Sequence, residues 1–135
     1  MKLITCVEDR FGLLYNRRRV SRDRGVTEKI SALLSGGVLW VDPYSAELFS
    51  PMITPRMDEK FLEMATKEDY CFLENRDIRP YVSRVDELIL FRWNRRYPYD
   101  LAFPFEECFG NWNLVSREDF PGNSHDPITL EVYHP

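Results

Sequence analysis

Five arginines and one aspartate stand within nine residues, from Asn16 to Arg24, in a chain whose net charge is −4. Guanidinium groups held close together can bracket a phosphate or a carboxylate, because each presents a planar fork of N–H donors. Ser21 would add a hydroxyl, and the carboxylate of Asp23 would orient neighbouring arginines. The segment therefore predicts an anion-binding loop formed by Arg17, Arg18, Arg19, Ser21, Arg22, Asp23 and Arg24. The alternative is a solvated loop with salt bridges to the protein's own carboxylates.

A second group of basic and aromatic residues belongs to the strongest strand candidate and the residues after it. This group consists of Arg92, Trp93, Arg95, Arg96 and Tyr97. Nucleobases stack on aromatic side chains in basic grooves, so the group could contact nucleic acid. A hairpin with a charged tip explains the same residues without a ligand. We favour the hairpin, since the net negative charge of the whole chain opposes the binding of a polyanion.

The remaining reactive side chains form no recognisable catalytic or metal-binding pattern. His125 stands in a turn-rich stretch, and we interpret it as a turn histidine whose ring is satisfied by nearby groups. Two histidines and the scattered Cys6, Cys71 and Cys108 lack the spacing of a zinc site. The cysteines indicate free thiols in a reducing compartment. We therefore expect no metal and no disulfide, and we assign no catalytic residue.

Length and composition are typical of one ordinary globular domain, residues 1–135. Of the 135 residues, 44% are hydrophobic and 30% are charged, which allows a single sizeable core. No signal peptide is visible, and no apolar stretch approaches the length of a membrane span. We expect a cytoplasmic protein with no membrane partner. The composition leaves its oligomeric state open.

Short apolar strands alternate with short helices along the chain. Strands are expected at Lys2–Val7, Val38–Val41, Met52–Thr54, Tyr70–Leu73, Glu87–Trp93, Trp112–Val115 and Ile128–Tyr133. Helices are expected from an N-cap at Thr27 through Leu34, and over Ser45–Phe49, Asp58–Ala65 and Arg76–Val82. Asp100–Phe103 is expected to return beside Glu87–Trp93 as a hairpin. Because the strands are continuously apolar, the pattern predicts an α/β three-layer sandwich with a mostly parallel central sheet and an antiparallel C-terminal hairpin.

Several stretches follow one another in an order that one known family also shows. Tyr70–Trp93 is similar to a strand, a helix and a strand of that family. Tyr99-Asp100-Leu101-Ala102-Phe103-Pro104 is similar to its Gly-Asp-Thr-x-Phe-Pro stretch, and Ser116–Pro121 with Leu130–Tyr133 is similar to its closing hairpin. In these features the chain resembles dihydrofolate reductase. The resemblance implies that fold, and it places the arginine run where the family has a mobile loop on the substrate side.

The same resemblance implies that the reductase chemistry is lost. The family holds its cofactor phosphates at a Gly-Gly pair and a Gly-Arg-x-Thr stretch. Here those places hold Leu73-Glu74-Asn75 and Val41-Asp42-Pro43-Tyr44, so Glu74 and Asp42 would oppose a phosphate as unpaired negative charges. Asp23 is nearest to the family's catalytic carboxylate, but the arginines around it would keep it deprotonated. We therefore expect no NADPH, no other cofactor and no reductase activity.

Three functions from different classes remain. We favour a binding protein for an anionic small molecule or nucleotide that uses the Arg17–Arg24 loop. The second is an enzyme that works in the retained cleft without a nicotinamide. The third is a factor that contacts RNA or protein through both arginine groups. The first requires the Asn16–Arg24 loop to lie at the carboxyl ends of the central strands, where open α/β sheets bind ligands.

Overall fold

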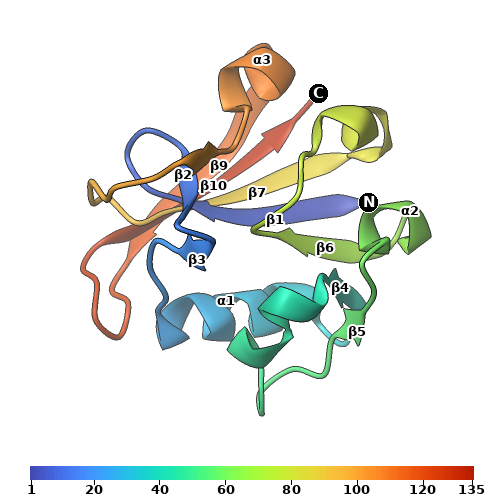
Figure 1. The fold of residues 1–135 in the computed structure, drawn as a ribbon, viewed down its shortest axis with the longest axis horizontal. Helices are drawn as coiled ribbons and strands as arrows, with labels where there is room; N and C mark the ends of the chain where they lie inside the picture. Colours follow the sequence, from blue (N-terminus) through green and yellow to red (C-terminus); the bar gives the residue numbers. More distant parts are fainter.

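A seven-stranded sheet forms the centre of the protein in the computed structural model, which describes residues 1–135 (Figure 1). The strand order is β5-β4-β6-β1-β7-β10-β9. The strands are β1 (Lys2–Val7), β4 (Leu39–Val41), β5 (Arg56–Met57), β6 (Tyr70–Leu73), β7 (Glu87–Arg92), β9 (Asn113–Phe120) and β10 (Ile128–His134). Neighbours from β5 to β7 run parallel, whereas β10 is antiparallel to β7 and β9. The predicted sheet and its C-terminal hairpin are confirmed, although β9 continues beyond the expected Trp112–Val115.

A second, smaller sheet has the order β3-β2-β8. It contains β2 (Gly12–Tyr15), β3 (Arg18–Arg19) and β8 (Leu101–Ala102). The prediction that Asp100–Phe103 returns beside β7 is wrong. Because β1 and β10 already occupy both sides of β7, the returning segment pairs with β2 instead. Asn16 and Arg17 join β2 to β3, and both have positive φ angles, 51° and 64°, as in a tight two-residue hairpin turn.

The longest helix is α1 (Arg24–Leu34), which ends at Ser35 in the left-handed conformation. Its N-cap is Asp23, whose carboxylate accepts a hydrogen bond from the N–H of Gly25 at 2.7 Å. The prediction of Thr27 as N-cap is wrong, because an aspartate one turn earlier supplies a charged acceptor to the same helix end. The shorter helices are η1 (Pro43–Leu48), α2 (Phe61–Met64), η2 (Arg79–Arg84) and α3 (Phe105–Phe109).

Three of the shorter elements differ from the expected ones. The helix expected over Asp58–Ala65 is shorter and consists of α2 alone. The side chain of Asp58 caps a turn before α2 by accepting a hydrogen bond from the N–H of Lys60. The helix expected over Arg76–Val82 shifts to η2, in which Pro80 stands in the first turn, where it needs no N–H. No strand forms at Met52–Thr54, because β5 takes the place beside β4.

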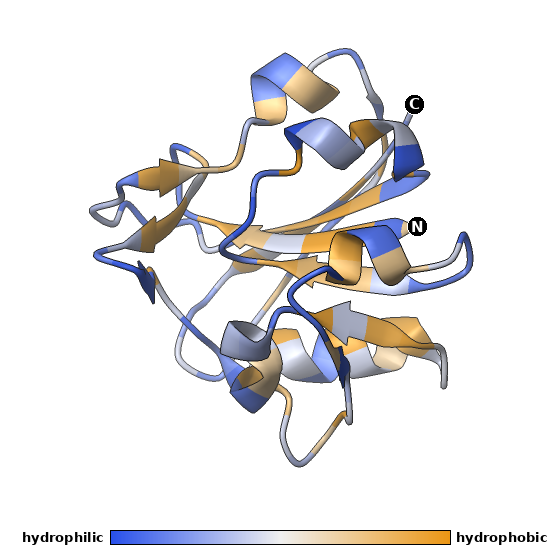
Figure 2. Cartoon of the chain, turned by 45° about the vertical axis from the view of Figure 1, so that its right-hand side comes forward, coloured by the Kyte–Doolittle hydropathy of each residue, from blue (hydrophilic) through white to orange (hydrophobic).

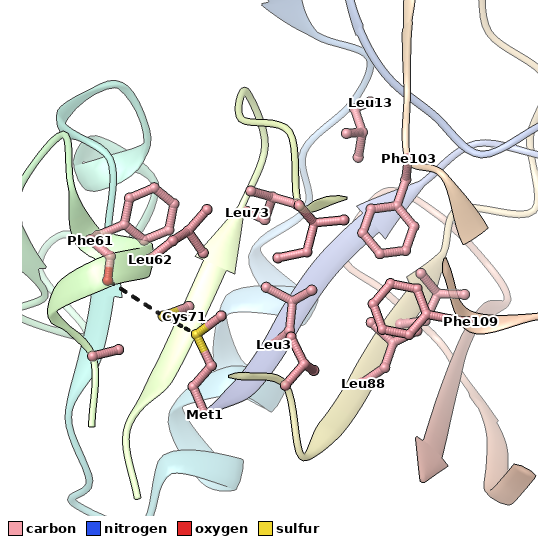
Figure 3. Close-up of a cluster of buried hydrophobic side chains, with 14 of the residues drawn as sticks. Met1, Leu3, Leu13, Phe61, Leu62, Cys71, Leu73, Leu88, Phe103 and Phe109 are labelled. Carbon is pink, nitrogen blue, oxygen red and sulfur yellow. Dashed lines mark hydrogen bonds between the residues drawn. The ribbon is translucent and has the colours of Figure 1, made fainter. Parts of the chain in front are cut away.

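Buried apolar side chains cover both faces of the large sheet. Neighbouring residues of one strand point to opposite faces, so Leu3 belongs to one cluster and Ile4 to the other. Figure 3 shows Leu88 of the first cluster beside Phe109, whose ring stacks on that of Phe103. In the second cluster, Ile30 of α1 packs against the sheet. The central strands are mainly hydrophobic along their length (Figure 2). The predicted three-layer arrangement is therefore confirmed.

None of the helices is both long enough and apolar enough to span a membrane. Cys6, Cys71 and Cys108 are free thiols. Burial raises the pKa of Cys71 to about 12, so this thiol stays protonated.

Candidate functional site

Three buried carboxylates stand at the carboxyl ends of parallel strands. Glu8 follows β1, Asp42 follows β4 and Glu74 follows β6, and none is more than 8% exposed. This edge is where open α/β sheets bind ligands. A buried carboxylate without a partner would be strongly destabilising, so each of these groups needs a donor or a positive charge beside it. The side chains that supply these partners determine how much of the edge remains open to a ligand.

Arg19 of β3 neutralises Glu74. Its Nε and Nη2 donate to the two carboxylate oxygens at 2.9 and 3.1 Å, and the hydroxyl of Ser45 donates to the same carboxylate at 2.6 Å. Nη1 donates to Glu47 at 2.8 Å, and the guanidinium lies over the ring of Tyr44. Burial acts to lower the pKa of Arg19, but the contacts with Glu74 outweigh it and raise the pKa. Arg19 therefore stays charged, with its donors used inside the protein.

Asp42 also has an arginine partner. Nη2 of Arg76 donates to Oδ1 of Asp42, while the amide of Asn75 donates to Oδ2 at 3.2 Å. The prediction that Asp42 and Glu74 stand as unpaired negative charges is therefore wrong. The partner arginines lie far from these carboxylates in the sequence, so local sequence patterns could not predict the two ion pairs. The side chains of Arg19, Glu74 and Ser45 nevertheless fill the space directly beyond β6.

The arginine run lies at this edge, and its members have different environments. Arg19 is fully paired. Arg22 and Arg24 are exposed, at 3.5 Å from a carboxylate of η1 and 3.7 Å from a carboxylate of α1. Arg17 and Arg18 are exposed and make no ion pair or side-chain hydrogen bond within the chain. The run thus divides into a structural arginine, two weakly paired arginines and two free ones.

The other two residues of the run, Ser21 and Asp23, meet His125 of the β9–β10 loop. Oδ2 of Asp23 lies 2.9 Å from Nδ1 of His125, and Oγ of Ser21 lies 2.8 Å from Nε2. The hydroxyl of Tyr97 lies 3.1 Å from the same Nε2. The Asp23 side chain is fully buried, and that of His125 is 8% exposed. Figure 1 shows the β9–β10 loop, in orange-red, next to the beginning of α1.

Asp23 is held in the ionised form. Its carboxylate accepts hydrogen bonds from the backbone N–H groups of Gly25, Asn123, Ser124 and His125. Burial acts to raise the pKa of Asp23, but the hydrogen bonds from Asn123, Ser124 and His125 outweigh it and hold the pKa well below its usual range. Because an ionised carboxylate only accepts, Nδ1 of His125 carries a hydrogen. In the neutral ring, Nε2 is then the acceptor for a hydroxyl.

A cavity of about 30 Å³ lies beside Ser21, between α1, η1 and the ends of β1 and β6. Its apolar wall comes from Val26, Ile30, Phe49, Phe72 and Trp93, with the thiol of Cys6 among them. A space of this volume holds about one or two water molecules. Burial away from water, and to a smaller extent the negative charge of Glu74, raises the pKa of Cys6 well above its ordinary value. The thiol therefore stays protonated.

A wider surface hollow of about 510 Å³ lies near the β2–β3 turn. Its lining includes Tyr15, Asn16, Arg18, Tyr97 and Pro98. Tyr97 contacts Nε2 of His125 from the hollow, whereas Ser21 contacts the same nitrogen from the cavity. A side chain from each of the two spaces therefore contacts the same nitrogen of His125.

The second basic and aromatic group does not form the surface that its sequence suggested. Trp93 is 2% exposed, and its ring packs on that of His125 with centroids 4.9 Å apart. Arg92 pairs with Glu131 and lies over Phe11. Base stacking on Trp93 is thus excluded by burial. No group of three or more His, Cys, Asp or Glu side chains is arranged to hold a metal ion.

Sequence reasoning missed the role of His125 in this site. Its ring is satisfied, as we expected, by Ser124 of its own turn but also by the distant Asp23, Ser21 and Tyr97. About a hundred residues separate His125 from Ser21 and Asp23, so no local motif joins them. The available signal was an aspartate at a helix N-cap two residues after a serine.

Comparisons with known proteins support the fold alone. No protein-family model matches the chain, and no curated protein matches it. Among solved structures, the chain is similar to dihydrofolate reductase from Enterococcus faecalis, complexed with NADP(H) and RAB-propyl, with a TM-score of 0.65 and 10% sequence identity. The alignment covers 99% of this chain and 95% of that one. The fold is therefore dihydrofolate reductase-like, as the sequence motifs implied.

Proposed function

We propose that the protein binds an anionic small molecule or nucleotide in the hollow beside Arg18, without a nicotinamide cofactor. The observation that supports this most directly is that Arg17 and Arg18 have no partner within the chain, and that Arg18 lines the hollow. A free guanidinium on the wall of a hollow can bind a phosphate or carboxylate through two parallel hydrogen bonds. Of the arginines in the Arg17–Arg24 loop, we propose that these two contact the anion. Arg19 is not among them, because it is already fully paired.

The size and the lining of the hollow fit a ligand of this class. Its volume of about 510 Å³ is within the usual range of small-molecule sites, about 300–1,000 Å³. Tyr15 is 48% exposed, and Tyr15 and Tyr97 both line the hollow. A nucleotide could stack its base on a tyrosine ring and place its phosphate on Arg18. A phosphate or carboxylate without a base would use the arginine contact alone.

We propose no nicotinamide cofactor because side chains fill the edge of the sheet beyond β6. A dinucleotide phosphate needs close approach to backbone N–H groups there. Glu74, Arg19 and Ser45 occupy that edge with their own hydrogen bonds. A phosphate would have to displace a paired carboxylate, so we expect calorimetry with NADPH to detect no binding.

The other two classes receive different support. A factor that contacts RNA or protein would depend on few free arginines, in a chain whose net charge is −4. Of the three functions, this one has the least support. An enzyme that works without a nicotinamide is favoured by one specific observation, the contact of Ser21 and Asp23 with His125.

The test is a thermal-shift and calorimetry series with nucleotides, inorganic phosphate and folates at low and moderate salt. A site-specific ligand should raise the melting temperature through its preferential binding to the folded state. Arg18→Ala should weaken binding by about 1.5–3 kcal/mol for each charged hydrogen bond lost. Arg117→Ala, on the edge strand β9, is the matched control and should bind like the wild type. Equal affinity in Arg18→Ala and the wild type would contradict the proposal.

A further inference from the structure

We propose that Ser21 is the nucleophile of an ester hydrolase site, in which His125 is the general base and Asp23 orients His125. Ser21 Oγ lies 2.8 Å from Nε2 of His125, and Nδ1 lies 2.9 Å from Asp23 Oδ2. These are the contacts that acyl transfer by serine, histidine and aspartate requires, and the arrangement is defined by geometry rather than by order in the sequence. The step needs neither a metal nor a cofactor.

The hydrogen-bond network gives each group its role. Asp23 is ionised and fully buried, so it fixes the hydrogen of His125 on Nδ1 and leaves Nε2 facing two hydroxyls. Of these hydroxyls, that of Ser21 is the nearer to Nε2 and is the one that lines the cavity. Cys6 lines the same cavity, but its thiol is protonated and is therefore a poor competitor as a nucleophile.

The residue after Ser21 supplies a donor for the negative oxygen that forms during acyl transfer. The backbone N–H of Arg22 has no acceptor within the chain, and Arg22 also lines the cavity. In many hydrolases, the N–H of the residue after the nucleophile stabilises the tetrahedral intermediate. We assign this role to Arg22.

The two spaces beside the network indicate the class of substrate. The cavity of about 30 Å³ has an apolar wall and admits only a short acyl group, such as acetyl. The wide hollow beyond Tyr97 has room for the alcohol portion. The substrate is therefore a carboxylic ester with a short acyl group. That its alcohol portion is anionic rests on the proposed function, whereas the acyl-transfer step does not.

The reaction has two stages. Oγ of Ser21 attacks the carbonyl carbon and gives its proton to Nε2 of His125; the carbon–oxygen bond to the alcohol then breaks, and the alcohol leaves with that proton. Water next attacks the acyl group on Ser21 and gives a proton to Nε2, which returns it to Oγ as the carboxylic acid leaves. The sum is ester plus water giving acid plus alcohol, with no oxidation or reduction.

The experiment uses a fluorophosphonate, which labels activated serines, and p-nitrophenyl acetate, an ester with a short acyl group. Peptide mapping by mass spectrometry should place the label on Ser21. Ser21→Ala should lose both labelling and turnover while keeping its melting temperature, and Ser116→Ala, an exposed serine of β9, should keep both. His125→Gln should slow labelling by about 10²–10⁴-fold, the usual contribution of a general base.

The outcomes separate this site from the proposed anion binding. A folded wild-type protein that stays unlabelled and inactive, or that is labelled at another residue, overturns the ester hydrolase, whether or not nucleotides bind. Labelling at Ser21 without calorimetric binding of nucleotide or phosphate supports the hydrolase and overturns the anion site. If His125→Gln fails to fold, Ser21→Ala and the wild-type label still decide the result.

Discussion

Two carboxylate networks lie side by side at the same edge of the sheet, and they end differently. In the closed network, Glu74 and Asp42 meet guanidinium groups, which hold their charge at every ordinary pH. In the open network, Asp23 meets His125, and the far nitrogen of that ring meets hydroxyls that line a cavity and a hollow. The first network can only hold the fold together, whereas the second can also move a proton.

The difference lies in the partner of each carboxylate rather than in its burial. Glu74 and Asp23 are both buried, and each is contacted by residues far away in the sequence. Arginine has no acceptor and does not give up its proton, so it cannot relay a proton to a further group. Histidine passes a hydrogen bond through its ring to a further group. Substitutions in the closed network should therefore lower stability alone, whereas those in the open network should also affect proton transfer.

Asp23→Ala should cause the largest loss of stability. It removes the N-cap of α1 and the acceptor that holds the β9–β10 loop, and it leaves several buried N–H groups unpaired. The expected cost is about 3–5 kcal/mol, because loss of an N-cap costs about 0.5–2 kcal/mol and each buried N–H group left unpaired costs about 1–3 kcal/mol. Urea unfolding measures it, and Asp126→Ala, whose carboxylate makes no hydrogen bond within the chain, is the control. A cost equal to that of the control would show that the open network does not support the fold.

Acid should weaken the same contacts without any substitution. Because the pKa of Asp23 is lower in the folded protein than in the unfolded chain, its stabilisation is present above the unfolded value of about 3.9 and is lost as the pH falls below it. The free energy of unfolding should therefore fall with pH in that window, by no more than the cost of Asp23→Ala. Asp23→Asn should flatten the fall, and Asp126→Asn should leave it unchanged. Equal slopes in all three proteins would contradict this assignment.

Arg19→Ala should have the next largest effect, since it leaves Glu74 buried with Ser45 as its remaining side-chain donor. We expect a loss of about 1.5–3 kcal/mol in the free energy of unfolding. The double variant Arg19→Met with Glu74→Leu should recover most of that loss, because buried ion pairs are often replaced by apolar residues at little cost. If the double variant lost the sum of the two single losses, the coupling energy would be zero, and Arg19 and Glu74 would not stabilise each other.

Arg18→Ala should have the smallest effect on stability, within about 0.5 kcal/mol, as for an exposed side chain without contacts. The loss in free energy of unfolding for Arg19→Ala would then be severalfold larger than that for Arg18→Ala in the same assay. A large loss in Arg18→Ala would reveal an internal partner for this arginine and would weaken the proposed anion site.

The fold was predictable where the chain forms long apolar strands. Lys2–Val7 and Tyr70–Leu73 begin and end as expected, because continuous β-branched and aromatic runs can be buried only in the interior of a sheet. The small sheet was not predictable, since β3 and β8 have two residues each and their pairing depends on which edges the large sheet leaves open. The N-cap of α1 was misplaced for a related reason: tertiary contacts around Asp23 decide it.

The candidate site was predictable only in part. The arginine run lies at the expected edge of the sheet, but its charge pattern could not tell Arg18 from Arg19, because Glu74 lies 55 residues from Arg19. Nor could the sequence join His125 to Ser21, since their contact depends on the β9–β10 loop reaching the start of α1. Local spacing identifies elements, whereas a site assembled across a sheet depends on topology.

The left-handed turn at Asn16 and Arg17 bears on how fast a ligand could bind. The turn is two residues long, and the strand that follows it is tied to the sheet through Arg19, so the backbone that carries Arg18 is already ordered. A binding surface formed before its ligand arrives loses little conformational entropy on association. Encounter would then be limited by diffusion and by orientation rather than by closure of a loop. Association should follow a single exponential, with a rate that rises linearly with ligand concentration.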